Sequence, residues 1–139
     1  GKHMKKEAFN TENLQEMAWF NWGVRLQDVK EVLYVTGTCD MMSPGHVMKC
    51  PDDPVGQAKQ IFEYMEEIFT KAGFTKQDIV YVDWAVTKDV THDQAFEILQ
   101  LWEAYVADLE VKPAAGIWKH VYSLIQPEML VEFELTLAR

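Results

Sequence analysis

The sequence predicts an α+β fold in which two helices pack on one face of a mixed β-sheet. Two kinds of pattern predict it. Two segments repeat apolar residues at three- and four-residue spacing, as amphipathic helices do, and several others alternate apolar with polar residues, as half-buried strands do. At 139 residues the chain has the size of one domain that buries a core without disulfides or metal. We expect residues 1–3 to be an expression scar and residues 4–139 to form that single domain.

The first helix is marked at both ends. Asp53 is suited to cap its free N–H groups, Pro54 fits the first helical position, and Gly73 provides a C-terminal stop. Between them runs a single apolar stripe, which predicts that one side of the helix faces a core. Its members are Ala58, Ile61, Phe62, Met65, Ile68, Phe69 and Ala72.

The second helix is predicted to begin at Thr91. Thr91 and Gln94 have the spacing of a capping box, in which each side chain bonds to the backbone N–H of the other residue. The apolar stripe that follows again covers one side only. It consists of Ala95, Ile98, Leu99, Trp102, Tyr105 and Val106.

Strands are predicted at residues 32–38, 78–87 and 131–137 from their alternation. Residues 23–29 are expected to be the hairpin partner of the first of these. A short strand is expected near Val47, and Gly116 to Val121 reads as another. The predicted order is therefore two strands, a long loop, a helix, a strand, a helix and two final strands.

Crossover connections would place both helices on the same face of the sheet. The opposite face would carry aromatic residues and carboxylates and would have no helix to cover it. Packing against copies of the same chain would cover such a face, so we expect a homo-oligomer. The residues concerned are Tyr34, Tyr81, Asp83, Glu132 and Glu134.

Charge and composition exclude several functions. The net charge of −9 has no compensating basic cluster, so nucleic acid is not an expected partner. No apolar run is long enough to span a bilayer and no signal peptide follows Met4, so we expect a cytoplasmic protein without a membrane partner. Cys39 and Cys50 lack metal-ligand spacing, as do His46, His92 and His120, so no metal site is expected.

Taken together in order and spacing, a set of short markers resembles the RidA/YjgF family of reactive-intermediate deaminases. That family has small, chorismate-mutase-like domains that assemble as homotrimers with a ligand cleft between subunits. The markers are Val35-Thr36-Gly37-Thr38, Gln57-Ala58-Lys59-Gln60, Ala72-Gly73-Phe74, Asp78-Ile79-Val80, Trp102-Glu103-Ala104-Tyr105-Val106, Pro113-Ala114 and Val131-Glu132-Phe133-Glu134.

The resemblance implies a set of site residues. Glu132 matches the glutamate that orients the attacking water, and backbone groups at Gly37 and Ile117 match the family's polar contacts. Trp22 corresponds to its aromatic wall. Ala115, however, stands where the family has an arginine that holds the substrate carboxylate, a bidentate role that other residues fill poorly.

Two cations are candidates to replace that arginine. If residues 115–119 form a strand, Ala115, Ile117 and Lys119 share one face and Lys119 reaches the same cleft. Arg25 is the second candidate, and the alternative for both side chains is that they are solvated surface charges. The aromatic residues Trp19, Phe20, Trp22 and Trp118 are interpretable as interface packing or as the lining of a wide, apolar pocket.

The resemblance implies hydrolysis of a reactive enamine or imine with release of ammonia, with substrate choice altered by Ala115. This chemistry requires a positioned water and a carboxylate, so no metal or organic cofactor is expected. Two alternatives stay open. One is a non-catalytic trimer that binds a small metabolite or a partner protein in the same cleft. The other is a related catalyst repurposed for a specialised biosynthetic or catabolic pathway.

Overall fold

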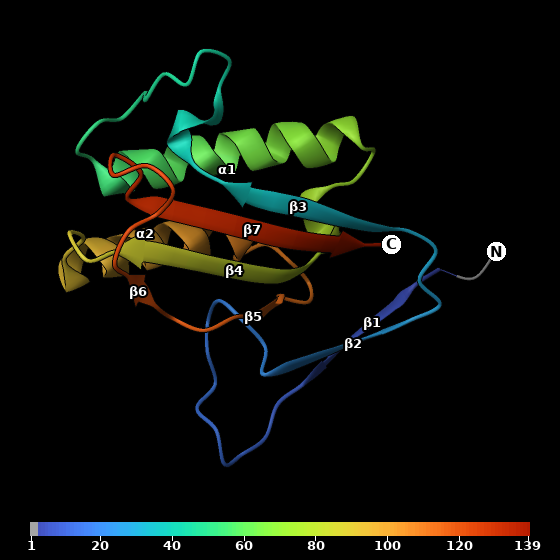
Figure 1. Ribbon diagram of the computed structural model, residues 1–139. Helices are drawn as coiled ribbons and strands as arrows, with labels where there is room; N and C mark the ends of the chain where they lie inside the picture. Colours follow the sequence, from blue (N-terminus) through green and yellow to red (C-terminus); the bar gives the residue numbers. More distant parts are fainter. Residues whose placement is uncertain (1–2) are drawn as a thin grey trace.

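The structure is a computed structural model that describes residues 3–139, so residues 1 and 2 of the expected scar lie outside it. The described residues form two α-helices, two short 3-10 helices (Asp40–Met42 and Lys76–Asp78) and seven strands. Figure 1 shows their arrangement. The strands are β1 (Lys5–Phe9), β2 (Gly23–Gln27), β3 (Val32–Thr38), β4 (Ile79–Thr87), β5 (Ala114–Ala115), β6 (His120–Val121) and β7 (Val131–Ala138). The helices are α1 (Pro54–Lys71) and α2 (His92–Val106).

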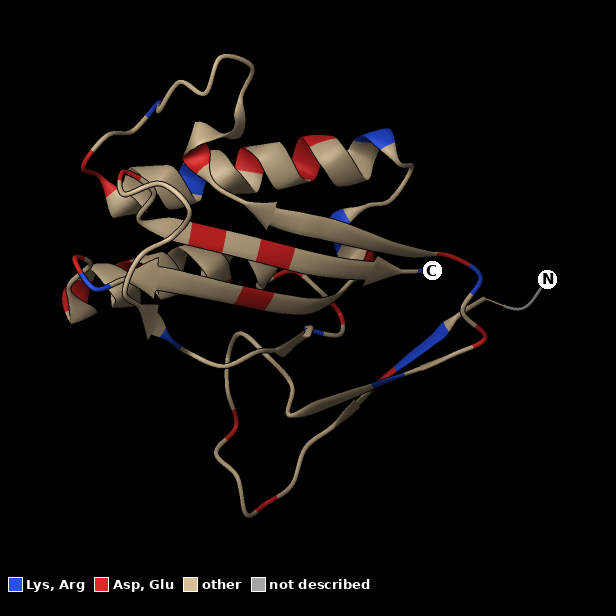
Figure 2. Cartoon of the chain, viewed as in Figure 1, with Lys and Arg blue, Asp and Glu red and all other residues tan. Residues whose placement is uncertain are grey.

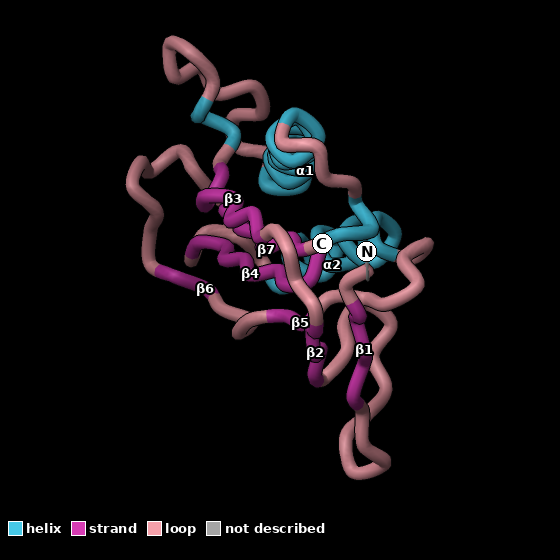
Figure 3. Tube along the Cα trace, turned by 90° about the vertical axis from the view of Figure 1, so that its right-hand side faces the viewer, coloured by secondary structure: helices cyan, strands magenta, loops and turns pink. Residues whose placement is uncertain are grey.

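The main sheet is mixed, as the sequence predicts. Its order is β3-β7-β4-β5, with β6 also pairing with β4. β3 and β4 run antiparallel to the central β7, whereas β5 and β6 run parallel to β4. Turned by 90°, the chain shows both helices on the same side of these strands (Figure 3). The predicted α+β architecture is therefore confirmed, and no helix of residues 3–139 covers the other face of the sheet.

Both helices form where their capping residues predict. The Asp53 carboxylate accepts a hydrogen bond from the Gly56 N–H, and Thr91 and Gln94 form the reciprocal capping box. Gly73 follows α1 with a φ of +84°, a conformation that costs glycine little. Two members of the predicted stripe differ. Ile68 is 42% exposed, because it lies at the edge of the helix facing the loop after β3, and Ala72 is exposed at the C-terminal end of the helix.

The core lies between the helices and the sheet. Trp102, Phe69, Phe133, Ile61 and Met65 are its largest fully buried side chains. Side chains alternate between the two faces along β7 and β4, and those of Phe133 and Trp84 face this core. Their rings stack there with centroids 5.2 Å apart. The intervening residues of the same strands therefore face the uncovered side.

Three strand predictions are corrected by the structure. β2 pairs with β1 in a separate two-stranded sheet and not with β3, since Lys5–Phe9 supplies a partner that no sequence pattern had suggested. No strand forms near Val47, where the chain makes turns and bends. Residues 116–119 are not in a strand either, because pairing with β4 is interrupted between β5 and β6.

That interruption is a bulge that changes which side chains share a face. Val82 pairs with Ala115 and Val86 with His120, so β4 advances four residues while its partner advances five. One extra residue reverses the alternation beyond it. Ala115 lies beside Val82 on the helix side, whereas Lys119 reaches Asp83 on the uncovered side. The expectation that Ala115 and Lys119 share one face is therefore wrong.

Among residues 3–139, no helix is long and apolar enough to cross a membrane.

Candidate functional site

A small polar pocket on the uncovered face of the sheet brings together three residues that the sequence singled out. Gly37 at the end of β3, Glu132 on β7 and Lys119 from the bulge line a cavity of about 110 Å³. Asp83 of β4 also lines it. These residues come from four separate parts of the chain, so the order of strands in the sheet is what assembles the pocket.

Glu132 is half-buried and closely held. The buried Cys39 thiol donates a hydrogen bond to Glu132 Oε1, with sulfur and oxygen 3.3 Å apart. Behind the carboxylate lies Gly37, where an added Cβ would stand 3.0 Å from Glu132 Cδ. The absence of a side chain at Gly37 is therefore what leaves room for the glutamate in this position.

The Cys39 thiol is a donor to Glu132 because it keeps its proton. Burial raises the pKa of the thiol well above its usual range, and the neighbouring carboxylates of Glu132 and Asp40 raise it further. Cys39 had no signal in the sequence as a site residue, since nothing local indicates that it meets a strand 93 residues further on.

Lys119 lies in the pocket but its charge is already paired. Its Nζ donates to Asp83 Oδ1 at 2.7 Å and to the carbonyl oxygens of Trp84 and Ile117 at 3.1 Å each. The three ammonium protons thus have three acceptors. Lys119 is consequently poorly placed to hold a substrate carboxylate, because it would first have to break its salt bridge with Asp83.

Several acidic side chains lie close together on this face, and the salt bridge between Lys119 and Asp83 places a positive charge among them. Asp83 lies directly opposite Glu134 in the β4–β7 register, and Glu132 is two residues away on the same strand. Figure 2 shows the acidic bands on β7 and β4 side by side. Like charges directly opposite one another destabilise a sheet, so Lys119 offsets part of the repulsion. Its salt bridge is one-third exposed at Lys119 and less so at Asp83.

The remaining predicted site residues lie elsewhere. Trp22 and Ala115 line a second pocket at the edge of the sheet, which they share with other aromatic side chains. Ile117 is 77% exposed at the bulge, and its carbonyl accepts from Lys119. Arg25 pairs with Glu7 on the β1–β2 hairpin and stacks over Phe9, away from both pockets.

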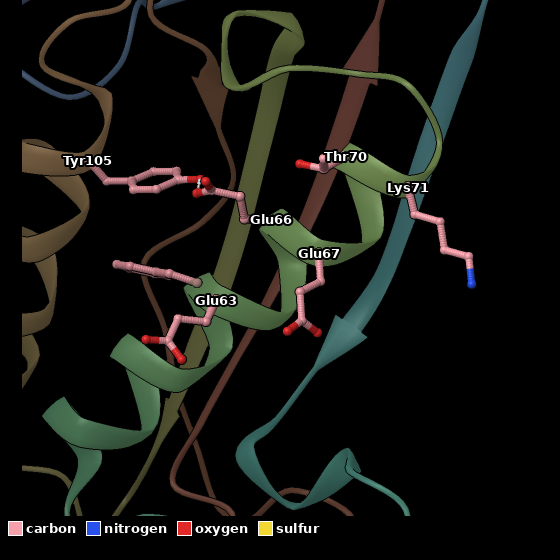
Figure 4. A pocket seen from close by; sticks show the side chains of 7 residues that line it. Glu63, Glu66, Glu67, Thr70, Lys71 and Tyr105 are labelled. Atoms are coloured by element: carbon pink, nitrogen blue, oxygen red, sulfur yellow. Dashed lines mark hydrogen bonds between the residues drawn. The ribbon is translucent and has the colours of Figure 1, made fainter.

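A larger hollow of about 680 Å³ lies on the opposite side of the molecule, between α1 and α2 (Figure 4). Its lining includes the carboxylates of Glu63, Glu66 and Glu67. The Tyr105 hydroxyl donates to Glu66 at 2.8 Å, and burial followed by this hydrogen bond raises the pKa of Tyr105. Open, acidic and far from Glu132, this hollow is not our candidate site.

Two histidines without sequence spacing for a metal site do meet in the fold. The rings of His92, at the start of α2, and His120, in β6, have centroids 5.1 Å apart. Within residues 3–139, no group of three or more His, Cys, Asp or Glu side chains is arranged to hold a metal ion.

Comparison with known proteins identifies the class to which this fold and site belong. The family model described as Endoribonuclease L-PSP matches residues 11–138. The chain therefore belongs to this family, which includes the Rid and YjgF proteins. None of the curated proteins matches the sequence.

Solved structures agree on the fold. A protein of unknown function of the conserved Rid family from Yersinia pestis, YyfB, is 24% identical with a TM-score of 0.79, over 96% of this chain and 98% of that one. Rv2704 from Mycobacterium tuberculosis, a member of the YjgF/YER057c/UK114 family, is 18% identical with a TM-score of 0.61, over 99% and 100%. NMB1025 from Neisseria meningitidis, a YjgF family member, is 16% identical with a TM-score of 0.62, over 99% and 98%.

Proposed function

We propose that this protein hydrolyses a reactive enamine or imine and releases ammonia, with Glu132 as the catalytic residue. The observation that carries the proposal is the placement of the Glu132 carboxylate. It lies in a pocket on the open face, against the backbone at Gly37 and oriented by the Cys39 thiol. A carboxylate fixed in this way is suited to position a water molecule.

The proposed chemistry needs only that carboxylate and a water. The reacting form is the protonated imine, and Glu132 accepts a proton from water as the water oxygen bonds to its electrophilic carbon, which gives a neutral carbinolamine. Glu132 then returns the proton to the nitrogen, and as the C–N bond breaks it accepts the hydroxyl proton, so that the carbonyl forms and ammonia leaves. Transfer of that proton to the released ammonia restores the carboxylate. An enamine enters the same route because protonation at its carbon gives the protonated imine directly. General acid–base assistance of this kind typically contributes about 10²- to 10⁴-fold in rate.

The substrate of this chain is proposed to differ from a small 2-imino acid. Ala115 cannot hold a carboxylate, and Lys119 is engaged by Asp83 and two carbonyl oxygens. A carboxylate placed next to Glu132 would also be repelled by Asp83 and Glu134 on the same face. A substrate that is uncharged near its reacting carbon avoids this repulsion.

We further propose that the open face is covered in a homotrimer. Tyr34 is 78% exposed and Tyr81 is 38% exposed on this face, beside the carboxylates of Asp83 and Glu134. An aromatic surface of this kind favours packing against further copies of the chain. The pocket of Glu132 would then become a cleft between subunits, closed from bulk water.

A second candidate function is a non-catalytic trimer that binds a small metabolite or a partner protein. The pairing of Lys119 with Asp83 favours it, because the site then lacks an available cation to polarise or hold a substrate. Repurposing of the catalyst for a specialised pathway differs from the main proposal only in the substrate. Cleavage of RNA, the activity in the description of the family model, is disfavoured by a net charge of −9.

The deciding experiment replaces Glu132 with glutamine, which keeps the size of the side chain and removes its charge. Ammonia release is measured for a panel of enamines and imines that includes aromatic and uncharged ones. We expect Glu132→Gln to lower turnover at least about a hundredfold while ligand affinity is retained. Glu134→Gln makes the same change two residues along the strand and should alter turnover far less.

The wild-type protein also separates the two candidate functions. Should wild type release no ammonia above the spontaneous rate from any member of the panel, while it still binds a metabolite, the binding function replaces the hydrolase.

A further inference from the structure

Two histidines far apart in the sequence meet where β6 lies beside the start of α2. His92 is the first residue of α2, and His120 is the first residue of β6. The centroids of their imidazole rings are 5.1 Å apart, and the ring planes are tilted by 48° to one another. Both side chains are exposed, so an ion from solvent can reach them.

The backbone of each histidine is held by its own element. The reciprocal capping box of Thr91 and Gln94 fixes the chain on both sides of His92. His120 pairs with Val86 in the ladder between β6 and β4. The two rings are thus brought together by elements that are already formed, which lowers the entropic cost of holding one ion between them.

The separation of the rings fits two ligands of one metal ion. A histidine nitrogen binds Zn²⁺ at about 2.0–2.1 Å, which places the ring centroid about 3.2 Å from the ion. Two rings at the tetrahedral angle then have centroids about 5.2 Å apart, whereas rings on opposite sides of the ion would have centroids about 6.4 Å apart. The observed 5.1 Å therefore corresponds to two neighbouring positions around one ion.

The lysines close to this pair in the sequence are each bound to a carboxylate. Lys88 pairs with Asp89 at 2.9 Å, and Lys119 pairs with Asp83 at 2.7 Å. The start of α2 is itself electropositive, but Asp93 adds a carboxylate in the same first turn. Together with a net charge of −9, these pairings leave the surface favourable to a cation.

We propose that His92 and His120 bind one divalent transition-metal ion, of which Zn²⁺ is the representative, with water in its remaining positions. Imidazole nitrogen suits zinc, copper and nickel, whereas Mg²⁺ and Ca²⁺ prefer oxygen ligands. A structural zinc site has four protein ligands, so an ion held by two exchanges with solvent and keeps open positions. The ion joins α2 to β6. Neither histidine lines the pocket of Glu132, so binding here does not depend on whether the protein turns over a substrate.

The test titrates the full chain with Zn²⁺. Cu²⁺ and Ni²⁺ are unsuitable probes, because an amino terminus followed by His3 chelates them through its own nitrogens. Calorimetry gives the affinity and the number of ions bound, and NMR follows the ring nitrogens of each histidine, assigned from single variants. We expect one Zn²⁺ per chain, with the resonances of His92 and His120 moving together along one saturation curve.

Single variants provide the second measurement. His92→Gln and His120→Gln should each weaken Zn²⁺ binding at least about tenfold, because loss of a direct ligand costs no less than loss of the group that orients one. His46→Asn is the matched control, since His46 is also exposed and asparagine tolerates its φ of +54°. Zn²⁺ should raise the Tm of wild type and His46→Asn, but not that of either glutamine variant.

Three results would overturn the assignment. One is a wild-type titration that shows no saturation at one ion per chain. Another is separate saturation of the two ring resonances, which would mean two independent sites. The third is a folded glutamine variant that binds Zn²⁺ as tightly as His46→Asn. If a glutamine variant fails to fold, the wild-type resonances still decide.

Discussion

Replacement of Gly37 with alanine tests the position of Glu132 with the smallest available change. An ideal Cβ at residue 37 stands 3.0 Å from Glu132 Cδ and 3.2 Å from Oε1, whereas ordinary contact begins at 3.4 Å. The carboxyl group must therefore retreat by 3.4 − 3.0, about 0.4 Å. It is the free end of a side chain, so it can move without disturbing β7.

The displacement is comparable with the tolerance of a catalytic group. Such groups must be held within about 0.5 Å of their working position, and a 1 Å misplacement can cost about a hundredfold in rate. We therefore expect Gly37→Ala to lower turnover about tenfold. The free energy of unfolding should change by less than about 1 kcal/mol, because the contact strain opposes the gain of about 0.4–1 kcal/mol from a stiffer unfolded chain.

The assay pairs ammonia release with thermal unfolding of the same samples. Gly23→Ala is the matched control, since its added Cβ would lie 3.6 Å from Phe9, an ordinary contact, in another strand. It should behave as wild type in both measurements. Unchanged turnover in a folded Gly37→Ala variant would refute the reasoning, because it would show that the carboxylate beside residue 37 takes no part in the reaction.

Two further predictions concern the thiol and the assembly. Burial and the nearby carboxylates raise the pKa of Cys39 in the folded state, so native stability should fall as the pH rises past 9.0, where the unfolded thiol ionises. Urea unfolding of wild type and Cys39→Ala at pH 7 and pH 10 checks this, and parallel pH profiles would contradict it. Light scattering at micromolar concentration should give a mass near three times the 16.1 kDa chain, and a stable monomer would remove the inter-subunit cleft.

Local patterns were sufficient to predict the elements whose residues interact along the chain. Asp53 and Gly56, and Thr91 and Gln94, are three residues apart, so the sequence itself contains both partners of each cap. The alternation of β7 similarly predicted that Glu132 faces away from the core. These features needed no knowledge of which strand lies beside which.

Features that depend on distant pairing were not predictable in the same way. β2 contains the same alternation whether its partner is β1 or β3, and only the folded chain selects β1. The Cys39 contact with Glu132 likewise exists because β3 and β7 are neighbours in the sheet. The bulge has no recognisable pattern in the sequence either, because Gly116 is compatible with a strand, a turn or an irregular segment.

The bulge is nevertheless the feature that decides the character of both pockets. With an uninterrupted strand, Ala115 and Lys119 would share a face, and the lysine would lie above the alanine as a free cation. The extra residue instead turns Lys119 onto Asp83, where it balances an acidic surface, and leaves Ala115 among aromatic rings on the other side. Charge and apolar volume are thus separated onto opposite faces of the sheet. A ligand anchored by a carboxylate therefore meets a lysine that is already paired with Asp83 on one face and a lining without a charged side chain on the other.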